Sequence, residues 1–159
     1  KSGTHVVVTI DLNSTPPICP HNMSPIEQDI VDEFDLFDDW LAKYDHLIAL
    51  GKELPPLEAA HKNDDNLIRG CQSKVWLYAE CPNGLLHFTA DSDAIITRGM
   101  VALLLRVVQN RPAEEVAREP FAFLNAIGLT SHLSPTRANG LASMVKQIKF
   151  YALAYAANE

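Results

Sequence analysis

The sequence has few positive charges and no long apolar run. Its 13 Lys and Arg residues stand against 20 Asp and Glu residues, which gives a net charge of -7 and a pI near 5.3. An acidic chain is poorly suited to a nucleic-acid backbone or an anionic membrane surface. No stretch stays apolar for the roughly 20 residues that a membrane-spanning helix needs. We therefore expect neither nucleic acid nor membrane as a partner.

Cysteine is also scarce, with three residues at Cys19, Cys71 and Cys81. An odd number without regular spacing does not make a disulfide framework and fits a reducing compartment, so we expect a cytoplasmic protein. A Cys71–Cys81 bridge is kept as an alternative. The sequence has no Cys-x-x-Cys or His-x-x-x-His pair and no glycine-rich phosphate loop. We therefore expect no metal site and no cofactor.

Residues 1–22 differ from the rest of the chain. A strand-like run at 6–10 is followed by a turn-rich segment with two adjacent prolines. Ser24-Pro25-Ile26-Glu27 then has the pattern of a helix capping box with proline at the first helical position. We expect residues 1–22 to be a leader or an extension outside the core, with its origin left open. Residues 23–159 are expected to form one domain.

Hydrophobic periodicity predicts an α+β fold, with a small antiparallel sheet packed against helices. Residues 74–80 and 85–90 alternate in polarity, and Pro82-Asn83-Gly84 between them predicts a hairpin turn. One helix is predicted from Ser24 to Leu50, with Gly51 as its stop and a mostly polar connection over 52–70. Asp91, Ser92 and Asp93 are candidate N-caps for a helix over 94–110 that is apolar nearly all round. Shorter helices are predicted at 113–117 and 120–127, and a last helix begins after Ser134-Pro135.

Seven acidic residues and no basic ones lie between Ser24 and Ala42. Such a run indicates either a solvated helix face or a patch that steers a basic partner.

Cys71 lies where the polar connection meets the first predicted strand. Gly70 removes side-chain bulk beside the sulfur, and Arg69 would favour the thiolate if its guanidinium turned toward Cys71. Packing is the alternative, because a lone cysteine is often a small buried hydrophobe. A hydrolase would need a positioned base, and His87 is the nearest histidine by hairpin geometry.

Four blocks of the sequence resemble the SufE-type sulfur acceptor family, which includes the CsdE proteins. The first is Gly70-Cys71-Gln72-Ser73 with Val75-Trp76, the active-cysteine segment. The others are the Leu50-Gly51 and Leu54-Pro55 segment, the Asp91-Ser92-Asp93-Ala94 block with Gly99, and the block from Leu129 to Leu141. The blocks occur in the family's order over about residues 24–158.

The resemblance implies a fold related to the IscU-type scaffold and a role as a sulfur carrier rather than a free-standing enzyme. Cys71 would accept persulfide sulfur from a pyridoxal-phosphate-dependent cysteine desulfurase of the SufS or CsdA kind and stimulate it. The sulfur would then pass to an iron–sulfur scaffold or another acceptor. The carrier itself needs no cofactor.

Seven further residues are predicted to support Cys71 or to bind the partner. Gln72 and Ser73 would shield the sulfur, Arg137 would face the partner or anchor the loop, and the desulfurase would dock around residues 62–73. Two alternatives stay open: a non-covalent module that activates the desulfurase, and a metal-binding cluster scaffold. The supporting residues are Arg69, Gly70, Gln72, Ser73, Asp93, His132 and Arg137.

Overall fold

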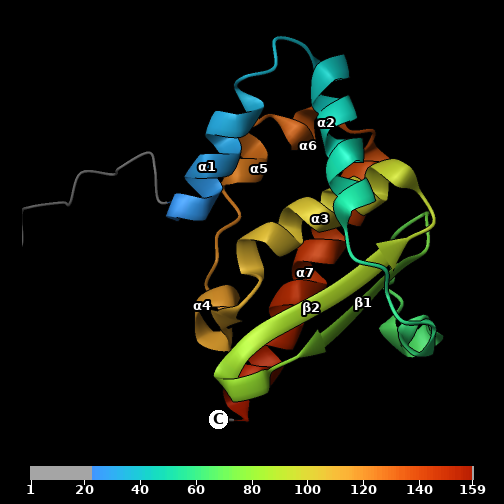
Figure 1. Ribbon diagram of the computed structural model, residues 1–159, viewed down its shortest axis with the longest axis vertical. Helices are drawn as coiled ribbons and strands as arrows, with labels where there is room; N and C mark the ends of the chain where they lie inside the picture. Colours follow the sequence, from blue (N-terminus) through green and yellow to red (C-terminus); the bar gives the residue numbers. More distant parts are fainter. Residues whose placement is uncertain (1–22, 159) are drawn as a thin grey trace, which may run out of the picture.

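A three-stranded antiparallel sheet with the order β1-β2-β3 is covered by helices in the computed structural model, which describes residues 23–158 (Figure 1). The α+β prediction is therefore confirmed. Cys19 and the strand predicted at 6–10 lie outside the described residues. Within this part of the chain, no helix is long and apolar enough to cross a bilayer. The elements are α1 (Pro25–Phe34), α2 (Trp40–Glu53), β1 (Val75–Glu80), β2 (Leu85–Ser92), α3 (Ile95–Val108), β3 (Arg111–Pro112), α4 (Ala113–Ala117), α5 (Phe123–Ala126), α6 (Leu129–His132) and α7 (Pro135–Ala157).

The hairpin forms as the alternating pattern predicts. β1 and β2 pair in register from Val75 opposite Ser92 to Glu80 opposite His87. The turn between them places Asn83 at φ 57° and Gly84 at φ 80°, a left-handed backbone that asparagine and glycine tolerate best. The apolar face of the hairpin is buried in the core, and its residues are Val75, Leu77, Ala79, Leu86, Phe88 and Ala90.

The other face of the hairpin lies under the 52–70 connection. The His61 ring stacks on Tyr78 at 3.7 Å between centroids, and Lys62 Nζ lies 5.6 Å from the centre of the Trp76 ring. Two 3₁₀ turns shape the connection, at Ala59–His61 and Asp64–Asn66. The polar segment is thus pinned to the sheet at several points, which positions the residues that follow it.

Helix α7 runs behind the hairpin in Figure 1, and two of its tyrosines reach carbonyls at the outer edge of β1. The hydroxyl of Tyr155 donates to the Ala79 carbonyl at 3.0 Å, and that of Tyr151 makes a longer contact of 3.4 Å with the Leu77 carbonyl. The Ile68 N–H donates to the Val75 carbonyl at 2.8 Å. These donors come from two different segments of the chain and bind alternate carbonyls of the edge strand, those of Val75, Leu77 and Ala79.

The single helix predicted from Ser24 to Leu50 is wrong, because the chain breaks between Phe34 and Trp40. Asp39 has an extended backbone and its carboxylate accepts from the Ala42 N–H at 2.8 Å, so it starts a second helix as an N-cap. Leu41, in the first turn of this second helix, is 74% exposed.

Gly51 does not end α2 but lies inside it, buried against α3. A Cβ on Gly51 would come within 2.7 Å of the Gly99 nitrogen, and a Cβ on Gly99 would clash with the Leu47 carbonyl oxygen. Both glycines therefore allow α2 and α3 to approach backbone to backbone. The helix ends two residues later at Glu53, before Pro55 and Pro56.

Candidate functional site

Cys71 lies on a short loop whose base is fixed. The Ile68 N–H donates to Val75 at 2.8 Å, which closes residues 69–74 into a loop at the start of β1. Gly70 has φ 91°, and a Cβ there would lie 2.6 Å from the Ser143 Oγ of α7. A side chain at position 70 would therefore strain the backbone and push the loop away from α7.

The residue that ends the loop, Lys74, is held by β2. The Asp93 carboxylate accepts from the Lys74 N–H at 3.0 Å, and the Ser92 hydroxyl donates to the Lys74 carbonyl at 2.8 Å. The prediction of Asp93 as a helix N-cap is thus wrong, because the residue at the N-cap of α3 is Ala94. Ser92 belongs to β2, although its Oγ also accepts from the Ala94 N–H at 3.2 Å.

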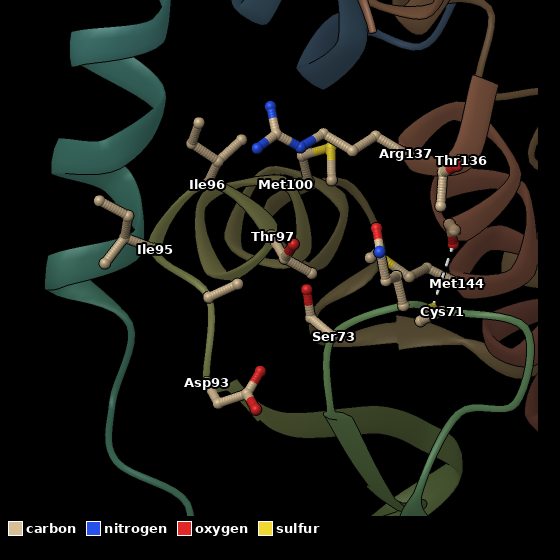
Figure 2. A pocket seen from close by; sticks show the side chains of 13 residues that line it. Cys71, Ser73, Asp93, Ile95, Ile96, Thr97, Met100, Thr136, Arg137 and Met144 are labelled. Atoms are coloured by element: carbon tan, nitrogen blue, oxygen red, sulfur yellow. Dashed lines mark hydrogen bonds between the residues drawn. The ribbon is translucent and has the colours of Figure 1, made fainter. Parts of the chain in front are cut away.

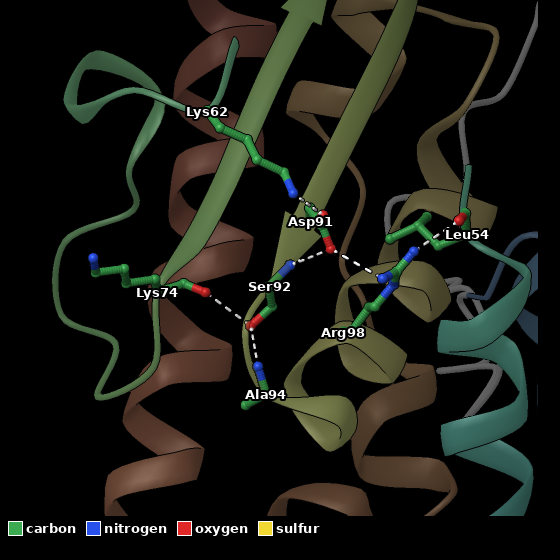
Figure 3. A network of polar contacts seen from close by, with 7 residues as sticks. All are labelled: Leu54, Lys62, Lys74, Asp91, Ser92, Ala94 and Arg98. Carbon is green, nitrogen blue, oxygen red and sulfur yellow. Dashed lines mark hydrogen bonds and ion pairs between the residues drawn. The ribbon is translucent and has the colours of Figure 1, made fainter. Parts of the chain in front are cut away.

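Asp91, the third candidate N-cap, is also a strand residue and the centre of a buried polar network (Figure 3). Its side chain is 8% exposed and binds Lys62 Nζ at 2.7 Å and Arg98 Nη1 at 3.3 Å. Arg98 in turn donates to the Leu54 carbonyl at 3.0 Å. Burial pushes the pKa of Asp91 upward, but Lys62, the Ser92 N–H and Arg98 outweigh it and hold this pKa below its usual value. The network joins the connection, β2 and α3 beside the site.

The thiol of Cys71 is free and half-buried. Its Sγ lies 3.6 Å from the Gly140 carbonyl oxygen in α7, which accepts a weak hydrogen bond. Burial raises the pKa of the thiol, and no cation of the described chain offsets this effect. A disulfide with Cys81, the alternative that the sequence left open, does not form.

Cys71 faces a hollow of about 430 Å³ between its own loop, the start of α3 and the start of α7 (Figure 2). Gln72, Ser73, Asp93 and Arg137 also line it, so five predicted site residues share one cavity. The remaining lining is largely apolar, and no sequence pattern assigned it to a site. It includes Ile95, Ile96, Met100 and Met144.

Two of these apolar residues differ in their exposure to solvent, which the all-round apolar pattern of α3 does not predict. Met100 is 1% exposed and belongs to the core, whereas Ile95 is 65% exposed at the rim of the cavity. Ile95 is thus a part of the apolar surface of α3 that solvent reaches beside the thiol.

Arg69 and His132 lie elsewhere. Arg69 lines a separate hollow with Asp64, Asp65 and Lys146, so the structure does not turn it toward the sulfur. The His132 ring stacks on Trp40 at 3.8 Å, and its Nδ1 lies 2.9 Å from the Gly128 carbonyl. That histidine ties α6 to α2.

His87 likewise lies outside the Cys71 cavity, opposite Glu80 in the hairpin register and beside two other hollows. The structure therefore offers Cys71 no His87 base. Within residues 23–158, no three His, Cys, Asp or Glu side chains converge in a way that would hold a metal ion.

Comparisons with known proteins match this chain to one family. Residues 28–152 match the family profile described as SufE, Fe-S metabolism associated domain. The chain is 41% identical over 132 residues to an uncharacterized SufE-like protein of Rhizobium etli, which covers 80% of this chain and 88% of that protein. It is 40% identical over 111 residues to the sulfur acceptor protein CsdE of Escherichia coli. This alignment covers 69% of this chain and 76% of CsdE.

The fold also resembles the solution structure of a hypothetical protein from Thermus thermophilus. The TM-score is 0.70 at 16% identity, over 84% of this chain and 97% of that one. The profile match spans most of the chain, and both sequence relatives share well over a third of the aligned residues with it. The chain belongs to the SufE family.

Proposed function

We propose that this protein is a sulfur carrier that accepts the outer sulfur of a persulfide held on a pyridoxal-phosphate-dependent cysteine desulfurase. The observation that carries this proposal is a free, half-buried Cys71 thiol that faces a largely apolar cavity from a loop with a fixed base. A relative named as a sulfur acceptor supports the same role. The pyridoxal phosphate belongs to the partner, and the carrier brings only its cysteine.

The transfer is a thiol–persulfide exchange. The Cys71 thiolate attacks the outer sulfur of the donor persulfide, a new S–S bond forms at Cys71, and the donor's S–S bond breaks. The donor sulfur leaves as a thiolate with the bonding pair, so no external oxidant or reductant is needed. Because burial raises the pKa of Cys71, the resting thiol is largely protonated near neutral pH. It becomes a better nucleophile when the loop brings it toward the partner.

We place the docking surface of the desulfurase around residues 62–73, with Arg137 at its edge. Cys71 has to reach a sulfur of another protein, and the contact with the Gly140 carbonyl is a weak hydrogen bond that is readily broken. Outward movement of residues 69–74 would expose the sulfur, and return to the cavity would shield the persulfide from bulk thiols. The sulfur then passes to iron–sulfur cluster assembly, in a reducing compartment such as the cytoplasm.

Mass spectrometry of the intact protein tests the proposal. After incubation with the desulfurase and cysteine, the wild-type protein and the control Cys81→Ser should each gain the mass of a sulfur atom, whereas Cys71→Ser should not. Serine is nearly isosteric, so the exchange at this half-buried site should cost less than about 1 kcal/mol of stability. A Cys71→Ser protein that still stimulates the desulfurase as well as the wild type would refute the carrier mechanism and favour a non-covalent activator.

A further inference from the structure

Arg137 is a cation without a carboxylate partner at the rim of the Cys71 cavity. It is exposed in the first turn of α7, and within residues 23–158 its guanidinium makes no ion pair. A positive charge in the first turn of a helix is disfavoured by the helix dipole, so this position does not stabilise α7. Four other arginines do have carboxylate partners, namely Arg98, Arg106, Arg111 and Arg118.

The position of Arg137 on α7 brings its side chain within reach of the sulfur. Gly140 lies three residues further along the helix, and a Cβ there would be 3.7 Å from Cys71 Sγ. Residues three apart on a helix are neighbours, with Cβ atoms about 5–6 Å apart. Figure 2 shows the Arg137 side chain extended across the cavity, over Met100 and toward Ile96. To reach the sulfur, the guanidinium has to rotate from this conformation toward Cys71.

The charge that needs a partner arises only after sulfur transfer. In a persulfide the terminal sulfur lies about 2.05 Å beyond Sγ, and it carries the negative charge once its proton has left to solvent. The cavity around it is largely apolar, and Asp93 is the acidic residue in its lining. An anion in such surroundings is costly unless a cation pairs with it.

We propose that Arg137 is a catalytic residue that binds the terminal sulfur of the Cys71 persulfide as an anion and holds it in the cavity. This assignment rests on the proposed function. It differs from a role in partner docking, because it requires no partner to be present. An arginine guanidinium presents a planar fork of N–H donors, which suits an anion.

The test loads the sulfur without the desulfurase. Inorganic polysulfide transfers one sulfur to the Cys71 thiolate and leaves as a polysulfide ion shorter by one sulfur. After the excess is removed, alkylation by iodoacetamide followed by mass spectrometry measures the reactivity of the persulfide against pH. The proteins compared are the wild type, Arg137→Gln, Arg137→Lys and the control Arg118→Gln, which removes another exposed arginine, one that pairs with Glu114. Arg137 is exposed, so thermal melting should show all four proteins folded.

We expect Arg137→Gln to shift the pH midpoint of alkylation upward by about one unit, the low end of the effect of a nearby opposite charge. Below the midpoint this shift makes alkylation about tenfold slower than in the wild type. Arg137→Lys should retain most of the wild-type profile, and Arg118→Gln should match it. An unchanged profile in Arg137→Gln, or a failure of the wild type to hold sulfur at Cys71, would overturn the assignment.

A parallel reaction with the desulfurase and cysteine separates the two proposals. If Arg137→Gln is defective only in that reaction and has the wild-type persulfide profile, Arg137 acts in docking and the anion-binding role is refuted. If the wild type takes sulfur from polysulfide but never from the desulfurase, the proposed function fails, while the polysulfide profiles still decide the role of Arg137.

Discussion

Glu27 permits a quantitative test of the packing between α1 and the segment that follows α4. Its side chain is 0% exposed. Burial, a hydrogen bond with Glu119 and the negative charge of Glu119 raise the pKa of Glu27 from 4.5 to about 7. Glu119 is also bound to Arg111 at 2.6 Å. We therefore assign the proton of the pair to Glu27, whose pKa is raised.

The sign and size of the effect follow from the two pKa values. The folded state binds the Glu27 proton more tightly than the unfolded chain does, so the contribution to stability is complete below 4.5 and is lost as the pH rises through about 7. Between about pH 5 and about pH 8 the unfolded carboxyl is mostly ionised, whereas the folded one ionises only near the end of this range. At about 1.4 kcal/mol per pKa unit, the free energy of unfolding of the wild type should fall by about 2–3 kcal/mol over this pH range.

Urea unfolding of the wild type and Glu27→Gln at these two pH values measures the loss. Glutamine keeps a hydrogen-bond donor toward Glu119 but does not titrate. The two proteins should be similarly stable at about pH 5, and the variant should be more stable by about 2 kcal/mol at about pH 8. The control Glu114→Gln, at an exposed glutamate of α4, should follow the wild type. If Glu27→Gln loses stability with pH as steeply as the wild type, the buried proton is not on Glu27.

Two further predictions, made with three substitutions, concern the residues that hold the site in place. Gly99→Ala should destabilise the protein by about 3 kcal/mol in urea unfolding, because its Cβ would clash with the Leu47 carbonyl oxygen. The control Gly140→Ala makes only ordinary contacts and should stay within about 1 kcal/mol of the wild type. Equal effects of the two substitutions would contradict the close approach of α2 and α3. Asp91→Asn should cost about 2 kcal/mol at neutral pH through the loss of charge-assisted bonds to Lys62 and Arg98. Because the pKa of Asp91 is lowered in the folded protein, this cost should shrink as the pH falls below about 4, and a cost that does not depend on pH would refute the ionic network.

Local sequence signals were enough to predict the hairpin and most of the helices. The alternation over 74–80 and the Asn83-Gly84 turn act between near neighbours, and both appear in the structure where predicted. The break before α2 was missed although its signal is present, since Asp39 is a good N-cap that lies hidden in a run of acidic residues. The short strand β3 and helix α6 have too few residues to show a period.

The errors at Gly51 and Asp93 have a different origin. Glycine commonly ends a helix, and aspartate commonly caps one. In this protein each of the two residues instead contacts a residue far away in the sequence. Gly51 meets Gly99, and Asp93 holds Lys74. The cavity at Cys71 could not be predicted for the same reason, because three segments build it and nothing in the pattern of α3 separates exposed Ile95 from buried Met100.

The tyrosines that α7 places along β1 bear on how this molecule meets other proteins. An edge strand with unsatisfied carbonyls invites a neighbouring strand to extend the sheet, either from a partner or from a second copy. Here the carbonyls of Val75, Leu77 and Ala79 already have donors from Ile68, Tyr151 and Tyr155. The Cys71 loop leads directly into this strand, so a sulfur donor or acceptor that reached Cys71 as proposed would approach the same edge. Such a protein could not extend the sheet at these carbonyls, and its recognition would depend on side chains and on the shape of the loop.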